Sequence, residues 1–279
     1  MMTRWLLLLS LLFCFACDDR MKASAARAPS ALDFMQPILE RDTAQIRKGL
    51  PNGAATLGKL LDEDPGHDPE GLRRNLEKAR ASVTELAIAK STFFVFVNAE
   101  GTVIRAEADP DLAAGGSLVK EIPDAKRIFT DAGMVEVFGS MHGLRGVERG
   151  GDLQWVVGHA VSTSKGARVG AFVTGWSYRK YVDFLEGALR RHLVDTADDK
   201  KRPAPLTYVF LARGDKAYGG AVTPDVDAEA VAKLGLPAKL GDELHQSTLT
   251  VEGQTFALVA RRVPTLDRDT VLVLLLAVV

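Results

Sequence analysis

The stretch FFVFVNAEGTVI, residues 93–104, is the strongest indication of the fold. Residues 93–97 form a run of aromatic and β-branched side chains that is apolar at every position. The turn at Asn98-Ala99-Glu100-Gly101 ends this run, and residues 102–104 return to β-branched side chains. Two such runs around a short turn predict a β-hairpin, and the unbroken apolar run predicts a central strand buried on both faces.

The sequence after this hairpin predicts a larger antiparallel module. Asp109-Pro110 and Gly115-Gly116 bracket a loop, and residues 121–131 have the pattern of a helix. Three strands and a second helix are expected next, at residues 134–141, 153–163, 168–176 and 178–193. The order strand, strand, helix, three strands defines a first module over residues 92–194.

The same order recurs after a charged, proline-containing linker at residues 195–205. Tyr208-Val209-Phe210-Leu211 is similar to Phe94-Val95-Phe96-Val97, at an offset of about 114 residues. The elements expected there are strands at 208–211 and 216–222, a helix at 225–234, and strands at 244–251, 255–262 and 271–279. We therefore expect a second, smaller module over residues 206–279 and an α+β fold, each module being an antiparallel sheet with flanking helices.

Helices are expected before the first module, as a stem over residues 31–91. Ser30 is a suitable helix cap, and apolar side chains follow at helical spacing until Pro51-Asn52-Gly53 ends the pattern. Asp68-Pro69 starts a second helix that reaches about Lys90. Its apolar stripe has a heptad-like spacing and comprises Leu72, Leu76, Ala79, Val83 and Leu86. The stripe predicts packing against the preceding helix or against a second copy, as a homodimer through the stem.

Composition excludes several classes of protein. The hydrophobic fraction of 47% and the charged fraction of 25% are those of a globular chain, not a disordered one. A formal net charge of −1 gives no basic field, so we expect no nucleic-acid partner. Two cysteines are too few for a disulfide scaffold or a four-cysteine zinc site.

Both cysteines lie in the first seventeen residues, within an apolar run from Trp5 to Cys17 that only Ser10 interrupts. The run is shorter than the roughly 20 residues of a membrane span. A basic start, a short apolar middle and a small residue before a cleavage site are typical of a secretory signal peptide. An uncleaved anchor helix and a signal cut at another site, which would release the protein, are the alternatives.

The end of this run, Cys14-Phe15-Ala16-Cys17, resembles the lipobox of bacterial lipoproteins. The resemblance implies a signal peptide of residues 1–16 and a diacylglyceryl group on Cys17. Residues 18–30 are small, polar and charged without an apolar period, so we expect a flexible tether over residues 17–30. Cys14 and Phe15 depart from the usual leucine and small residue of the motif. The implied location is the cell envelope, with the protein anchored to a bacterial membrane and facing the periplasm or the exterior.

The body of the chain resembles the double Cache extracytoplasmic sensor domain, a relative of the PAS fold. One match is the hairpin at residues 98–104 followed by Asp109-Pro110 and Gly116-Ser117-Leu118. Another is the strand pair Val157–Val161 and Val169–Val173, in which a glycine begins the last strand. The resemblance implies that the membrane-distal module binds a small metabolite. The arginine-tryptophan-tyrosine pattern of the amino-acid-binding members is absent as a contiguous motif, so an amino-acid ligand is not expected.

Candidate binding residues are the polar or aromatic side chains on the expected strands of the first module. They are Arg105, Trp155, His159, Phe172, Thr174 and Trp176. Strand alternation places Trp155 and His159 on one face of their strand. It likewise places Phe172, Thr174 and Trp176 on one face of the next strand. An aromatic pocket with an arginine and a histidine predicts a small carboxylate or another small anion as ligand. The alternative is that Trp155 and Phe172 belong to the core and that Arg105 is a solvated strand residue.

The sequence contains no catalytic constellation, so we do not expect an enzyme. Ser177 lacks the glycine two residues on that a nucleophile elbow needs, and the five histidines lack metal-ligand spacing. No metal or cofactor is expected. The leading hypothesis is a lipid-anchored sensor that binds a small molecule and signals through a membrane protein. The alternative is a structural or assembly lipoprotein that binds another envelope protein, and an envelope hydrolase is a third, less supported hypothesis.

The lipid anchor is tested by Cys17→Ser, which removes the thiol that would carry the lipid. The variant should leave the membrane fraction, because two or more buried acyl chains give stable anchoring and their loss removes it. Fractionation of cells that express the full chain measures this. A variant that still sediments with membranes contradicts the anchor, unless an uncleaved signal helix is shown to retain it.

Overall fold

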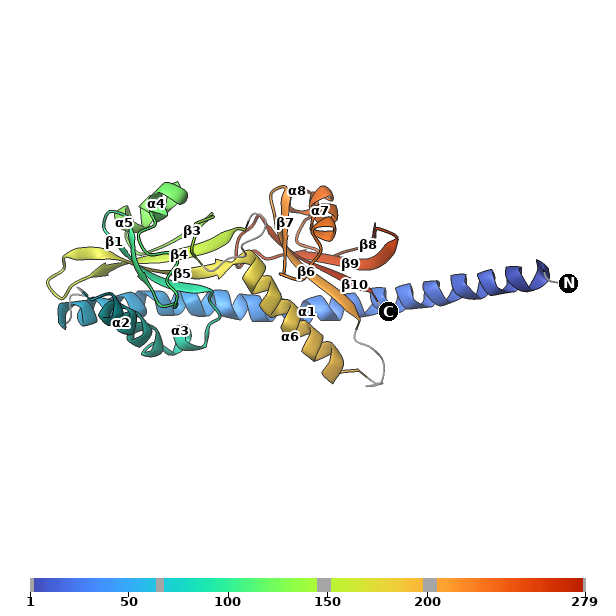
Figure 1. Cartoon of the computed structure of the whole chain (residues 1–279), viewed down its shortest axis with the longest axis horizontal. Coiled ribbons are helices and arrows are strands. Elements are labelled where there is room, and N and C mark those ends of the chain that lie inside the picture. The colour runs from blue at the N-terminus through green and yellow to red at the C-terminus, as the bar shows by residue number, and fades with distance from the viewer. Residues whose placement is uncertain (1–2, 64–67, 145–151, 198–204, 278–279) are drawn as a thin grey trace. The chain divides into compact units, whose positions relative to one another are not determined.

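The computed structural model describes residues 3–63, 68–144, 152–197 and 205–277, with side chains described from residue 21 onward (Figure 1). The chain divides into two compact units, one formed by Leu39–Tyr181 and the other by Met1–Ile38 together with Val182–Val279. Each unit contains one five-stranded antiparallel sheet. The expected α+β fold, with two such modules after a helical stem, is confirmed.

Helix α1 (Thr3–Glu63) is continuous where the sequence predicted a tether. Residues 21–30 are helical, and both Ser24 and Ala28 are buried. These small side chains carry little apolar signal, so the sequence did not reveal that the buried stripe begins there and continues into Leu32. Cys14 and Cys17 lie outside the residues whose side chains are described, and lipidation stays a prediction. Within the described residues, no helix is long and apolar enough to cross a membrane.

The predicted helix end at Pro51 is also wrong, because α1 continues through this residue to Glu63. A proline inside a helix removes one backbone hydrogen bond and costs about 3 kcal/mol. The neighbouring side chains of Leu50, Ala54 and Leu57 are buried, so burial of this helix face offsets that cost.

The second stem helix is divided in two. Helix α2 (Pro69–Ala81) starts as expected, since the Asp68 side chain accepts hydrogen bonds from the amides of Glu70 and Gly71. The predicted continuous helix to Lys90 is interrupted at Val83, whose extended backbone precedes α3 (Thr84–Ile88). All five residues of the predicted apolar stripe are nevertheless buried within the single chain.

The first module has the expected succession of strands. The strands are β1 (Phe93–Asn98), β2 (Val103–Ala106), β3 (Met134–Gly139), β4 (Gln154–Ser162) and β5 (Arg168–Ser177). In place of one helix at 121–131, three short helices follow β2, namely α4 (Leu118–Glu121), η1 (Pro123–Lys126) and α5 (Arg127–Thr130). We call these three the cover. Helix α6 (Tyr178–Asp195) follows the last strand, and the sheet order is β2-β1-β5-β4-β3.

The second module repeats this arrangement, as the internal repeat predicted. Its strands are β6 (Leu206–Arg213), β7 (Lys216–Gly219), β8 (His245–Val251), β9 (Gln254–Arg262) and β10 (Thr270–Ala277). Its helices are α7 (Asp225–Lys233) and α8 (Leu236–Lys239). The order β7-β6-β10-β9-β8 matches the first sheet strand for strand. The central strands β1 and β6 both have long runs of buried residues, as the sequence predicted.

Two glycines let the cover lie directly on the first sheet. A Cβ atom added to Gly158 would lie 2.5 Å from Ile128, and one added to Gly139 would lie 2.7 Å from Ile122. Neither distance is possible between real carbon atoms, so these strand positions accept only glycine without movement of the cover.

We expect Gly158→Val to lower the free energy of unfolding by about 1–3 kcal/mol, the usual cost of overpacking a core. Urea unfolding measures the change. Gly241→Val is the matched control, because no described atom lies within 4 Å of an added Cβ there. Equal stability of the two variants would show that the cover does not rest on Gly158.

Candidate functional site

The first sheet carries all six predicted binding residues on the same face. Cross-strand pairing joins Trp155 to Trp176 and His159 to Phe172, and Phe96 lies between Phe172 and Arg105. The predicted sharing of faces is therefore correct. This face lies against α1, because a Cβ atom added to Gly53 of α1 would approach the Phe172 ring to 2.9 Å.

Four of the six side chains are fully buried: Trp155, Phe172, Thr174 and Trp176. Their polar groups have partners inside the protein. Trp155 Nε1 donates to Glu136 Oε2 at 2.9 Å, and Thr174 Oγ1 donates to the Phe93 carbonyl at 2.7 Å. Trp176 Nε1 donates to the carbonyl oxygen of Lys90 at 2.5 Å. These residues therefore hold the module together in the structure.

Arg105 and His159 keep partly exposed side chains but are not neighbours. They lie on β2 and β4, with β1 and β5 between them, which is a separation of about 14 Å at the usual strand spacing. The Arg105 guanidinium is 3.3 Å from the carboxylate of Asp111 and 3.7 Å from that of Glu70. The structure thus does not bring Arg105 and His159 around one small anion, and ligand binding by the six residues stays a prediction.

The helix that packs on this face, α1, contributes a buried carboxylate that the sequence did not single out. Asp42 of α1 is fully buried, and its Oδ2 accepts a hydrogen bond of 2.9 Å from the Tyr181 hydroxyl. The Tyr181 ring in turn stacks on Trp176, with 4.0 Å between centroids. Burial raises the pKa of Asp42 despite hydrogen bonds from Tyr181 and Arg41, and burial together with the Asp42 charge raises the pKa of Tyr181.

A second polar contact joins α1 to the sheet beside this carboxylate. Arg47 donates two hydrogen bonds to Glu136 of β3, at 2.6 and 2.7 Å. The same Glu136 carboxylate accepts the indole N–H of Trp155, and the Arg47 guanidinium lies over the Trp155 ring. A bidentate arginine–carboxylate pair fixes orientation as well as distance, so α1 is held to the sheet in one register.

The sequence did contain a signal for Asp42. Asp42 and Thr43 lie between Leu39 and Ile46 on the buried stripe of α1. A polar residue within an apolar stripe needs a partner, because an unpaired buried carboxylate is strongly unfavourable. Its partner Tyr181 lies 139 residues away in sequence, which spacing alone does not reveal.

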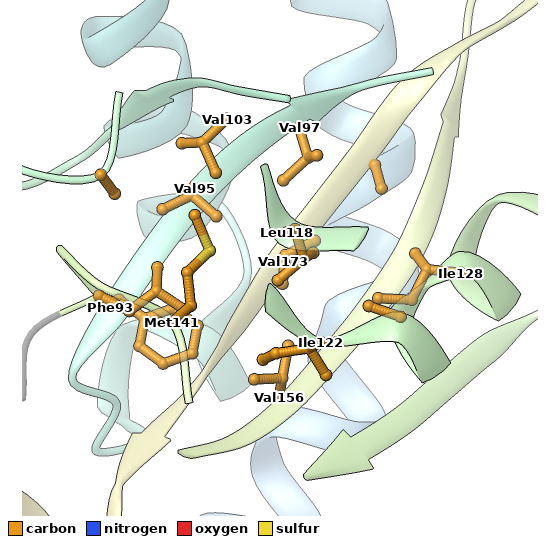
Figure 2. Packing of buried hydrophobic residues seen from close by; sticks show 14 of the residues in the cluster. Phe93, Val95, Val97, Val103, Leu118, Ile122, Ile128, Met141, Val156 and Val173 are labelled. Atoms are coloured by element: carbon orange, nitrogen blue, oxygen red, sulfur yellow. The ribbon is translucent and has the colours of Figure 1, made fainter. Parts of the chain in front are cut away.

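The opposite face of the sheet packs against the cover and is mainly apolar, with the buried amide of Gln154 at one end (Figure 2). Figure 2 shows Met141 beside Phe93, Ile122 beside Val156 and Leu118 beside Val173. A ligand entering between sheet and cover would therefore meet a largely apolar surface, with the Gln154 amide at one end.

The chain segment after β3 closes one end of this cluster. The buried side chain of Gln154 accepts a hydrogen bond of 2.6 Å from the Met141 amide, and Glu121 of the cover accepts one of 2.8 Å from the His142 amide. Both bonds position Met141, which is 1% exposed. In the described residues, no group of three or more histidine, cysteine, aspartate or glutamate side chains is arranged to hold a metal ion.

Comparison with known proteins gives matches in structure but not in sequence. No protein-family model matches the chain, and no curated protein matches its sequence. A domain of a sensory box/GGDEF family protein from Vibrio parahaemolyticus has a TM-score of 0.53 at 10% identity, covering 93% of this chain and 97% of that one. An extracellular ligand binding receptor from Desulfohalobium retbaense has a TM-score of 0.51 at 13% identity, covering 89% of this chain. The match spans only 40% of that receptor's length.

A third match is the ligand binding domain of the Pseudomonas aeruginosa amino acid chemoreceptor PctB in complex with L-Gln. Its TM-score is 0.44 at 17% identity, over 94% of this chain and 90% of that one. The two matches with TM-scores above 0.5 confirm, at the level of the fold alone, the α+β architecture of two PAS- or Cache-like sheet modules that the sequence predicted.

The Asp42–Tyr181 contact makes a stability prediction. Asp42→Ala should lower the free energy of unfolding by about 1–3 kcal/mol, because the buried Tyr181 hydroxyl loses its acceptor. Asp42→Asn keeps an oxygen acceptor and removes a carboxyl group whose ionisation is disfavoured by burial. In the unfolded chain this carboxyl ionises near pH 4, and in the folded chain at higher pH because its pKa is raised. Wild-type stability therefore falls relative to Asp42→Asn as the pH rises through this interval.

Thermal unfolding of both variants across this pH range measures the difference. Tyr181→Phe is the matched control for loss of the hydrogen bond alone. It removes the hydroxyl, and it keeps both the Asp42 carboxyl and the ring stacked on Trp176. A stability difference between wild type and Asp42→Asn that does not change with pH would contradict the raised pKa.

Proposed function

We propose that this chain is a lipid-anchored, extracytoplasmic binding protein that senses a small molecule and signals through a membrane protein, without catalysis. The observation that carries the proposal is the layering of the first module. One face of its sheet is held to α1 by the part-buried Arg47–Glu136 pair and by the buried Asp42–Tyr181 hydrogen bond at the start of α6, and the other face lies under three helices of four residues each. The similar sensor and ligand-binding structures support this reading at the level of fold.

The proposed mechanism uses the sheet as the transmitter. The three helices of the cover are short, with few internal hydrogen bonds, and in the proposed mechanism the cover is the part of the module that moves. A ligand that binds between cover and sheet favours one position of the cover and hence one packing of the strands. Because Tyr181 and Glu136 bind Asp42 and Arg47 of α1, a change in the strands alters the packing of α1.

The residues beneath the cover favour an uncharged ligand or an apolar part of one. A carboxylate placed there would be buried without a partner, which is unfavourable. Arg105, the arginine proposed from the sequence for a small anion, is already paired with Asp111 and Glu70 on the other face. Burial of apolar ligand surface contributes about 25 cal/mol per Å².

An assembly or structural lipoprotein is the second candidate. It is favoured by the direct packing of Ile122 and Ile128 on Gly139 and Gly158, which brings the cover onto the sheet. In this function the cover is part of the core, and the protein recognises another envelope protein by its surface.

Thermal-shift screening against polar and apolar compounds tests the sensor proposal. A ligand at one hundred times its Kd stabilises the protein by about 2.7 kcal/mol, so the melting temperature should rise by several degrees. We expect the active compounds to be uncharged or largely apolar.

Substitutions of two neighbouring residues of β5 show which face of the sheet binds the ligand. Val173 belongs to the cluster beneath the cover, whereas Phe172 faces α1. Val173→Leu should abolish the ligand-dependent shift, and Phe172→Leu, as the matched control, should retain it although both lower basal stability. Absence of a shift with every compound, together with co-purification of one envelope protein, contradicts sensing and supports the assembly function.

A further inference from the structure

Strand β8 at the edge of the second sheet lacks the protection that edge strands usually have. The outer edge of β2 is occupied by the loop at Gly115 and Gly116, whose backbone groups bond with Val103. Strand β3 carries the ion-paired Glu136, and β7 has only four residues. By contrast, β8 has seven residues, pairs with β9 without a bulge, and contains no proline, lysine, arginine or carboxylate. Such an edge is suited to pairing with another strand.

The geometry of the hairpin shows which backbone groups of β8 are free. Glu252 and Gly253 form a two-residue turn with φ values of 47° and 83°, so Val251 and Gln254 form the hydrogen-bonded pair that closes it. Bonded and non-bonded pairs alternate in an antiparallel ladder. Thr250 therefore belongs to a non-bonded pair, in agreement with the 3.0 Å between its hydroxyl and that of Thr255.

By the same alternation, Gln246, Thr248 and Thr250 direct their backbone N–H and C=O groups away from β9. All three side chains are exposed. In the described part of the chain, no backbone group outside β9 bonds to β8. The sheet therefore ends in a row of unpaired donors and acceptors spaced for one more strand.

The sequence of β8 is compatible with its own copy in the antiparallel direction. Antiparallel pairing about Thr248 places Thr248 of one copy opposite Thr248 of the other, and Gln246 of each copy opposite Thr250 of the other. The outward-facing backbone N–H and C=O groups of the two strands then meet. The strand has no lysine, arginine, aspartate or glutamate, so no such charges repel one another across the axis. The flanking acids also avoid each other, since Glu252 falls opposite Leu244 and Glu243 falls opposite Gly253.

We propose that β8 pairs with β8 of a second copy of this chain, antiparallel about a two-fold axis at Thr248. This interface is separate from the stem homodimer considered from the sequence, and it does not depend on the identity of any ligand. A seven-residue strand pair buries less than the roughly 1,200 Å² of a stable interface. The association is therefore weak and reversible, and it strengthens when copies are concentrated on one surface.

Disulfide trapping in the full chain tests the register. Cysteines at position 248 would have Cα atoms about 5.5 Å apart across the axis, within the range of a disulfide. Under oxidising conditions Thr248→Cys should give a covalent dimer that a reductant reverses. Thr250→Cys is the matched control, because its two copies are offset by about 14 Å along the strands. The wild-type chain, which has only Cys14 and Cys17, gives the background.

A second pair of variants tests the same register without altering Thr248. The two variants, Gln246→Cys and Thr250→Cys, are expressed together with different tags and should form a mixed disulfide. Neither variant should form a disulfide dimer when it is expressed alone. The proposal is overturned if Thr248→Cys forms no more dimer than Thr250→Cys and the mixed pair also fails. It is likewise overturned if Thr248→Cys is trapped only with a different protein.

Discussion

The burial of the Asp42 carboxylate in α1 is the constraint on which the first module depends. A carboxyl group without solvent must be hydrogen-bonded or neutral, and Tyr181 supplies the hydrogen bond from the start of α6. The Tyr181 ring is fixed in its turn by stacking on Trp176, the penultimate residue of β5. One contact thus joins the stem helix, the last strand of the sheet and the helix that follows it.

This constraint explains why the two faces of the first sheet differ. The face against α1 carries the indoles, Thr174 and Glu136, whose polar atoms are satisfied by α1 or by neighbouring backbone. The face against the cover is mainly apolar, apart from the buried amide of Gln154, and two glycines admit the cover closely. Most of the buried polar contacts are therefore on the α1 face. The cover is held chiefly by shape and by hydrophobic burial, which is not directional, together with the hydrogen bond that Arg168 donates to the Phe129 carbonyl.

The sequence predicted the strands and the repeat well, because an alternating or unbroken apolar pattern between glycine turns is a local property. Residues 93–97 and 208–211 both form central strands. Alternation also showed correctly which candidate residues share a face. It did not show which element covers that face, because this depends on contacts such as Asp42–Tyr181 between distant segments. The continuation of α1 through Pro51 was missed for the same reason, since packing of the helix face outweighs a local breaker.

The contacts of α1 also differ in kind between the two units. In the first unit Asp42 is fully buried and the Arg47–Glu136 pair is bidentate. In the second unit Arg261 binds Asp33, but the Asp33 side chain is 57% exposed. Exposed pairs contribute about 0–1 kcal/mol, whereas breaking a buried one costs several times more. The buried Asp42–Tyr181 hydrogen bond is therefore the costlier of these polar contacts to break, while the Arg261–Asp33 pair can be exchanged at little cost.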